Sequence, residues 1–267
     1  MFDIHSGSPH SIWVPVDCAA GAFDTLYVGQ LVKATSDGVG PLGAASGVFD
    51  TTAEAIPFGV VIGTNKRTPS YSATSLSESI TSASPHANTT EFVLQEGAMF
   101  PKGDTTALVK VALIQPGTII KGSIFASTIG TALTVGTVST GSTTGAGFTT
   151  SAINPATHVA DLVTVYFRTG ANKGIYRITT DASTTVKTVD HYFPYDIAIG
   201  DTVVGVPLRI GYSYGQTDSE SIFINGAAAP ANDHWGWNVL WLDLSVAGKE
   251  CAYFQFGHIH FVGAARA

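Results

Sequence analysis

Residues 162–180 read LVTVYFRTGANKGIYRITT, and this stretch decides the fold class. Two runs rich in β-branched and aromatic residues, 162–168 and 175–180, flank the sequence GANKG at 170–174. Such runs favour strands, and Asn and Gly supply the positive φ that a tight turn between two strands needs. GANKG lacks the Gly-Lys-Ser/Thr ending of a phosphate-binding loop, and a strand follows it where that loop requires a helix. The stretch therefore predicts a β-hairpin.

The rest of the chain repeats this pattern of short apolar runs bounded by Gly, Pro, Asn or Asp. Almost no window has the apolar spacing of a helix without Gly, Pro or many β-branched residues. Further strands are expected at residues 26–33, 58–62, 91–95, 107–114, 202–207 and 239–246. This punctuation predicts an all-β protein of β-sandwich or β-barrel-like lobes, with long Ser/Thr/Gly-rich loops and very little helix.

Changes in composition predict the domain organisation. Residues 64–90 are rich in Ser and Thr and contain Pro69 and Pro85, which indicates a long loop or arm. Residues 129–152 consist largely of Thr, Gly and Ser and are expected to form a flexible connector or a thin hairpin. We therefore expect an N-terminal β lobe over 1–128, which carries the loop 64–90, and a C-terminal β lobe over 153–267.

The polarity of the chain is neutral rather than charged. Among 267 residues, 32 Thr and 22 Ser outnumber 13 Lys and Arg and 20 Asp and Glu, and the formal net charge is -7. Nucleic acid and anionic membranes attract proteins through Lys and Arg, so we expect neither as a partner. The first residues lack the pattern of a signal peptide, and no run approaches 18 apolar residues, so a soluble protein is expected.

Two cysteines, Cys18 and Cys251, are too few for a disulfide scaffold and have no neighbouring Cys for a metal knuckle. Reduced, buried thiols are expected, and a bridge between them is left open. His258 and His260 lie two apart on an expected strand and share one face, so they are the candidate metal ligands. Zinc takes three or four ligands, and no third one lies at a suitable spacing. We therefore expect no metal and no other cofactor.

The sequence GYSYG at 211–215 matches G-x-S-x-G, the turn that presents a nucleophilic serine in hydrolases. The partners of Ser213, in hydrolase order, would be Asp233 or Asp243 and then His258 or His260. That turn requires a helix after the serine, whereas residues 216–225 read as a turn and a strand. Ser213 is thus expected at a strand end, and we expect no enzyme; ester hydrolysis lost in Ser213→Ala would show otherwise.

Two Asp-His pairs, Asp190-His191 and Asp233-His234, could form acid–base dyads. Adjacent residues on a strand point to opposite faces, and no nucleophile can be assigned to either pair. We therefore expect them to serve turns.

An aromatic cluster near the C-terminus supplies the candidate interaction residues. Both faces of the strand expected after Trp235 are apolar, which is typical of a central strand covered on both sides by core or by a neighbouring subunit. Core, an oligomer contact and a carbohydrate contact remain open for these side chains. The candidates are Trp235, Trp237, Trp241, Tyr212 and Tyr214.

The N-terminal half resembles the head decoration (capsid cement) proteins of tailed bacteriophages. The resemblance is carried by LYVGQLV at 26–32, a turn SDG at 36–38, IPFGVV at 56–61 and EGAMFPKG at 96–103. Residues 166–207 are similar to β modules of phage virion proteins.

The resemblance implies a structural virion protein on the outer surface of an icosahedral head, where it clamps neighbouring capsomers. Its expected partners are the major capsid protein and its own copies, as a homotrimer. A tail, fibre or receptor-binding component is the alternative virion role, which glycan binding by the tryptophans would favour.

Overall fold

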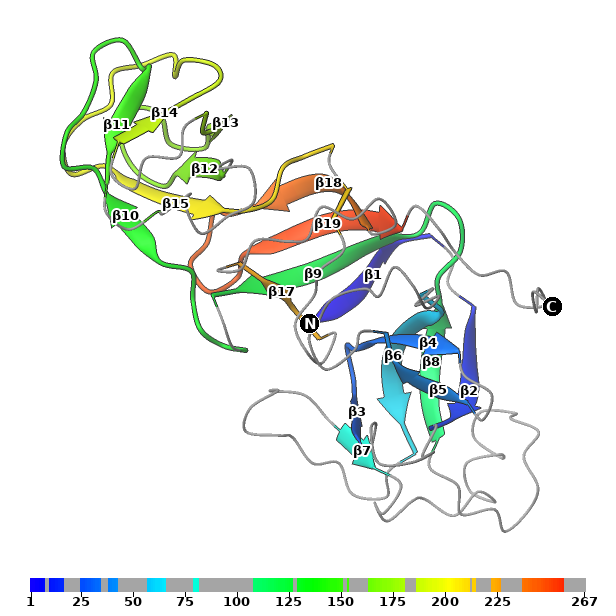
Figure 1. The fold of residues 1–267 in the computed structure, drawn as a ribbon. Helices are drawn as coiled ribbons and strands as arrows, with labels where there is room; N and C mark the ends of the chain where they lie inside the picture. The colour runs from blue at the N-terminus through cyan, green and yellow to red at the C-terminus, as the bar shows by residue number, and fades with distance from the viewer. Residues whose placement is uncertain are drawn as a thin grey trace, which may run out of the picture. The chain divides into compact units, whose positions relative to one another are not determined.

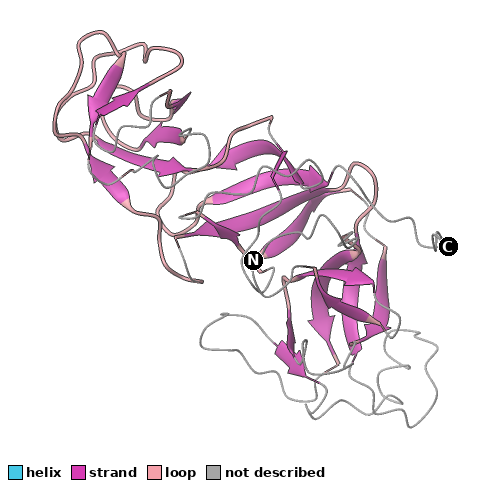
Figure 2. Cartoon of the chain, in the orientation of Figure 1, coloured by secondary structure: helices cyan, strands magenta, loops and turns pink. Residues whose placement is uncertain are grey.

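The computed structural model describes residues 1–7, 10–16, 25–34, 38–42, 57–65, 79–81, 108–126, 129–150, 153, 163–180, 186–211, 213–214, 222–226 and 237–256. Within these ranges the regular structure consists of β-strands and includes no helix (Figure 2). The predicted all-β class is therefore confirmed. The described part accordingly has no helix of the length and hydropathy that a membrane span requires.

The chain divides into two compact units, each assembled from separate parts of the sequence. Unit 1 comprises Met1–Gly122, Thr217–Phe223 and Gln255–Ala267, and unit 2 comprises Ser123–Gln216 and Ile224–Phe254. The chain thus passes between the units four times, whereas the sequence analysis places one boundary segment between two continuous lobes.

The segment 129–152, expected to be a connector or a hairpin, lies within unit 2. It contains β10 (Val135–Thr137) and β11 (Gly147–Thr149). β10 pairs with β15 (Thr202–Val206), and β11 pairs with β14 (Val186–Thr188). The backbone of this segment therefore supplies one strand to each of two sheets.

The main sheet of unit 1 is antiparallel, with the strand order β2-β8-β6-β4-β5 (Figure 1). Its strands are β2 (Ser11–Pro15), β4 (Leu31–Ala34), β5 (Val39–Pro41), β6 (Gly59–Thr64) and β8 (Leu108–Leu113). The remaining pairs of unit 1 use β1 (Phe2–Ser6), β3 (Thr25–Tyr27), β7 (Ser79–Thr81) and the start of β9 (Ile119–Phe125). Aliphatic side chains of these strands form one core, which contains Val16, Leu26, Val32, Val39, Val61, Val109 and Val111.

The prediction of one continuous strand at 26–33 is wrong, because a turn divides these residues between β3 and β4. Gly29 has a φ of 85°, which favours glycine, and the Gln30 backbone N–H donates to the Tyr27 carbonyl at 3.1 Å. The Gln30 side-chain oxygen accepts from the Tyr27 N–H at 3.0 Å. Gln30 is 1% exposed, so its buried amide closes the turn.

Within the expected loop 64–90, the described residues 79–81 form a short strand, β7 (Ser79–Thr81). β7 pairs antiparallel with β3, and Ile80 is the register partner of the buried Leu26. Most of the remaining residues of this loop lie outside the described ranges.

Unit 2 contains the antiparallel sheet β10-β15-β12-β13, with β12 at Thr164–Phe167 and β13 at Tyr176–Ile178 (Figure 1). In another sheet the strand order is β9-β19-β18-β16, and β17 pairs parallel with β9. These strands are β16 (Ser213–Tyr214), β17 (Ile224–Asn225), β18 (Trp237–Asp243) and β19 (Cys251–Phe256).

The predicted hairpin at 162–180 is confirmed. Tyr166 faces Tyr176 across the β12–β13 pair, and the turn glycines Gly170 and Gly174 have φ values of 79° and 90°. Asn172 has a different role from the expected one, because its buried side chain donates to the carbonyl of Tyr195 at 2.9 Å. The turn is thereby fastened to the loop that follows β14.

Three phenylalanines form the centre of the unit 2 core. The ring of Phe167 lies edge-on to Phe148 and to Phe193, with centroid distances of 5.2 Å and 4.9 Å. Edge-to-face pairs of this kind stabilise a core beyond the effect of buried area. The surrounding core residues are Val138, Ile153, Val163, Val165, Val189, Ile197 and Val203.

A buried ion pair connects the sheet that contains β12 with the sheet that contains β19. Arg168, which follows β12, places Nη2 at 2.5 Å from Oε1 of Glu250, which precedes β19. The Arg168 Nε donates to the Leu244 carbonyl at 2.9 Å, and the Glu250 carbonyl accepts from the Ile124 N–H at 2.8 Å. The Glu250 side chain is fully buried, and its Oε2 has no hydrogen-bond partner among the described residues. The carboxylate therefore depends on Arg168 for its charge compensation.

We expect Arg168→Ala to lower the free energy of unfolding by about 3–5 kcal/mol, because it leaves the Glu250 carboxylate buried and unpaired. Urea denaturation followed by tryptophan fluorescence measures this change. The control is the double variant Arg168→Met with Glu250→Leu, which removes both charges and should recover most of the loss. Equal destabilisation by the single and the double variants would contradict this account.

Candidate binding site

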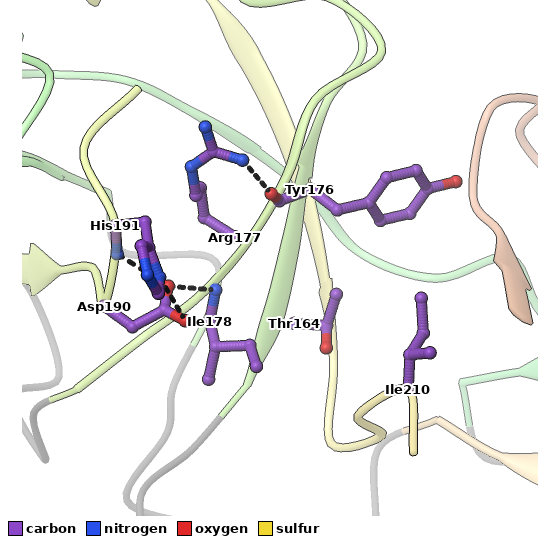
Figure 3. A pocket seen from close by; sticks show the side chains of 7 residues that line it. All are labelled: Thr164, Tyr176, Arg177, Ile178, Asp190, His191 and Ile210. Carbon is purple, nitrogen blue, oxygen red and sulfur yellow. Dashed lines mark hydrogen bonds and ion pairs between the residues drawn. The ribbon is translucent and has the colours of Figure 1, made fainter. Parts of the chain in front are cut away.

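A pocket of about 190 Å³ opens on unit 2 beside the β12–β13 hairpin (Figure 3). Pockets for drug-sized ligands have volumes of roughly 300–1,000 Å³, so this one has room for a smaller group. Its walls come from β12, β13, the turn after β14 and the segment after β15. The lining residues are Thr164, Tyr176, Arg177, Ile178, Asp190, His191 and Ile210.

Asp190 and His191 form the polar end of the pocket. Oδ2 of Asp190 lies 3.1 Å from Nδ1 of His191, and Oδ1 accepts from the backbone N–H groups of Ile178 at 3.1 Å and His191 at 2.9 Å. These backbone bonds confirm the predicted turn role of the pair. The side chains nevertheless meet, because both residues lie beyond the end of β14, where strand alternation no longer separates them.

Electrostatics keep the Asp190 carboxyl ionised. Burial raises its pKa, but the hydrogen bond from the His191 side chain and the bonds from the N–H groups of Ile178 and His191 outweigh burial. The pKa of Asp190 therefore lies below its ordinary value. The His191 side chain is 82% exposed, so the pair stands at the mouth of the pocket.

Arg177 lines the pocket between Tyr176 and His191, and it holds the backbone on both sides. Its Nη1 donates to the Tyr176 carbonyl at 2.7 Å, and its Nε and Nη2 donate to the Tyr192 carbonyl at 3.3 Å and 3.2 Å. The guanidinium also lies 5.3 Å from the centre of the Phe193 ring. Two of the three guanidinium nitrogens of Arg177 therefore hold Tyr192, the residue that follows His191.

Tyr176 forms the aromatic end of the pocket. Its hydroxyl donates to the Leu242 carbonyl at 2.9 Å and accepts from the Leu244 N–H at 3.4 Å. Burial raises the pKa of Tyr176, which the bond from Leu244 only partly offsets, so the phenol stays protonated as a donor. Its ring lies 4.6 Å from Tyr166 and 5.8 Å from Trp241 between centroids. Contacts on several sides thus fix the ring.

Trp241 is exposed in the single chain, so of the environments left open for it, core, an oligomer contact or a carbohydrate contact, the core of unit 2 does not apply. Trp241 is 53% exposed and its neighbour Leu240 is 38% exposed, whereas Val239 and Leu242 are fully buried. β18 does lie between β19 and β16, but β16 is only two residues long. An indole ring that contacts Tyr176 on one side and is about half exposed is available to a ligand.

The other predicted interaction residues are less fully described. Tyr214 and Trp237 are register partners in the β16–β18 pair, so the fold brings their backbones together. Tyr212 and Trp235 lie outside the described residues, as do the candidate metal ligands His258 and His260. Among the described residues, no group of three or more His, Cys, Asp or Glu could hold a metal.

The residues considered for hydrolysis have structural partners where they are described. Ser213 begins the strand β16, at a strand end as expected, and its backbone pairs with that of Asn238 in β18. Oδ1 of Asp243 accepts from both the N–H and the hydroxyl of Ser245, at 3.0 Å and 2.6 Å. Asp233, His234 and Cys18 lie outside the described residues, and Cys251 is buried.

The sequence analysis did not predict the contact between the rings of Tyr176 and Trp241. Tyr176 occupies an ordinary position in the hairpin, and Trp241 belongs to a strand of another sheet. The available signal was the tyrosine pair Tyr166 and Tyr176 on facing strands, which marks an aromatic face on which a third ring can pack.

No family model, no curated protein and no solved structure matches this chain.

The lowered pKa of Asp190 predicts a pH-dependent contribution to stability. The contribution is present above the unfolded Asp pKa of about 3.9 and is lost as the pH falls through the lower folded value. We therefore expect Asp190→Asn to be less stable than the native chain at pH 7, with the difference shrinking below pH ~4. Urea denaturation between pH 7 and pH 3 measures this, and parallel pH profiles for the two proteins would contradict it.

Proposed function

We propose that this chain is a structural virion protein of a tailed bacteriophage that binds the outer surface of the icosahedral head. In this role it stabilises the shell by clamping neighbouring capsomers. Its partners are the major capsid protein and its own copies, arranged as a homotrimer. The proposal extends the resemblance at 26–103 and 166–207, and the all-β architecture of both units supports it.

The observation that carries the proposal is the character of the exposed surface of unit 2. Neutral hydroxyl pairs occupy it, such as Thr180 with Thr188 at 2.9 Å and Thr169 with Thr202 at 3.1 Å. Large apolar side chains are exposed on the same unit: Val186 at 48%, Tyr192 at 65%, Ile199 at 73% and Val246 at 51%. A surface of this kind can be buried against identical neighbours without charge repulsion, which suits a component present in many copies.

The test compares virions made with and without the gene for this chain. We expect particles that lack the protein to release their DNA at a lower temperature or at low ionic strength, and particles with the protein to show its density on the head. Supplying the purified chain to deficient particles should restore their resistance. Unchanged resistance together with no density on the head would refute the proposal.

A second candidate role is a tail, fibre or receptor-binding component, which the exposure of Trp241 and Leu240 favours. Antibodies against the chain, with immunogold labelling of intact virions, distinguish the two locations. Label on the tail and none on the head would support the second role, and label over the head would support the first.

A further inference from the structure

We propose that the pocket of unit 2 binds one sugar residue of a neutral carbohydrate, with Trp241 beside it as a platform for an adjoining residue. This binding activity goes beyond the proposed structural role, and it holds whether the protein stands on the head or the tail. The proposal rests on the combination of an apolar surface, unused hydrogen-bonding positions and a fixed aromatic ring in one small pocket.

The apolar part of the pocket suits the C–H face of a sugar ring. Figure 3 shows Tyr176 and Ile210 on one side of the pocket and Asp190 with His191 on the other, with Ile178 beside the acid. Ile210 is 41% exposed, so it lies open at the rim. A volume of about 190 Å³ suits a single ring better than a drug-sized molecule.

The aromatic side is rigid before any ligand binds. The Tyr176 hydroxyl is held by the backbone at Leu242 and Leu244, and its ring is packed against Tyr166 and Trp241. A ligand that rests on this ring does not have to immobilise it, which lowers the entropic cost of binding. The neighbouring indole of Trp241 extends the aromatic surface beyond the pocket.

The polar side has hydrogen-bonding capacity that suits hydroxyl groups. Oδ2 of Asp190 contacts only Nδ1 of His191 among the described residues, so it can accept a further hydrogen bond. Because Nδ1 of His191 contacts the acid, its other ring nitrogen, Nε2, offers a second hydrogen-bonding atom on a side chain that is 82% exposed. A sugar hydroxyl both donates and accepts, so it can bond to both Asp190 and His191.

The charges of the pocket disfavour an anion. The Asp190 carboxylate repels phosphate and carboxylate groups and offsets the charge of the Arg177 guanidinium, which directs three of its five N–H groups to the carbonyls of Tyr176 and Tyr192. A neutral polyol meets no such repulsion. It also suits a chain with a formal net charge of -7.

The test begins with the purified full chain on an array of neutral and acidic glycans. Titrations followed by NMR then use glucose, galactose, mannose and N-acetylglucosamine, together with their disaccharides. We expect millimolar binding of at least one neutral sugar and tighter binding of its disaccharide. Trp241→Ala should remove the advantage of the disaccharide and weaken binding of the monosaccharide much less.

Two variants examine the pocket itself. Asp190→Asn should weaken binding at least tenfold, and Ile210→Arg should block the rim; because Ile210 is partly exposed, this variant is expected to fold. The matched control is Tyr195→Ala, an aromatic side chain that is 58% exposed and does not line the pocket; it should bind as the native chain does.

Three results would overturn the proposal. They are no binding of any neutral sugar at tens of millimolar, binding that Asp190→Asn and Ile210→Arg leave unchanged, and binding of acidic glycans alone. The first two would show that the pocket is not a sugar site, and the third would show that the site takes anions. None of them bears on the capsid role, which the virion experiments test separately.

Discussion

The buried pair of Arg168 and Glu250 is the constraint on which the arrangement of unit 2 depends. A buried carboxylate is costly unless it is paired, so the end of β12 must stay where its guanidinium reaches the start of β19. Arg168 also donates to the carbonyl of Leu244, and two strand positions away in the hairpin register the Tyr176 hydroxyl contacts the same segment, at Leu242 and Leu244. The ion pair of Arg168 and Glu250, which lies outside the pocket, therefore helps to position Tyr176, the aromatic side of the pocket.

The scarcity of charge in the sequence is reflected in how the described side chains make contacts. Thr180 with Thr188 and Thr169 with Thr202 are hydroxyl pairs in places where many proteins have exposed ion pairs. The charged groups have specific tasks: Arg177 holds backbone carbonyls, and Asp190 accepts from N–H groups of a turn. Hydroxyl contacts are not screened by salt, so this surface keeps its contacts over a wide range of ionic strength.

Local signals in the sequence predicted the local structure well. The hairpin at 162–180 and the strand at 202–207 were predictable because apolar runs and turn residues sit side by side there. The division of residues 26–33 was not, because it depends on a buried side chain, Gln30, that closes a turn. Asp190 and His191 were recognised only as turn residues.

The candidate site was harder to predict, since it joins residues distant in the sequence. Hydropathy indicates that Trp241 prefers burial, but it does not show which face of β18 the neighbouring strands leave open. The contact between Trp241 and Tyr176 arises from the packing of one sheet on another, which no spacing within either strand encodes.

The fourfold passage of the chain between the units has a consequence for the order of folding. In order of synthesis, residues 123–254 contain all of unit 2, with Thr217–Phe223 of unit 1 set within them. Unit 1 begins before unit 2 in the sequence, yet its segment Gln255–Ala267 follows unit 2. N-terminal parts usually fold first during translation, but here the first unit to be started is the last to be completed. Completion of unit 1 thus requires residues that lie on the far side of unit 2 in the sequence.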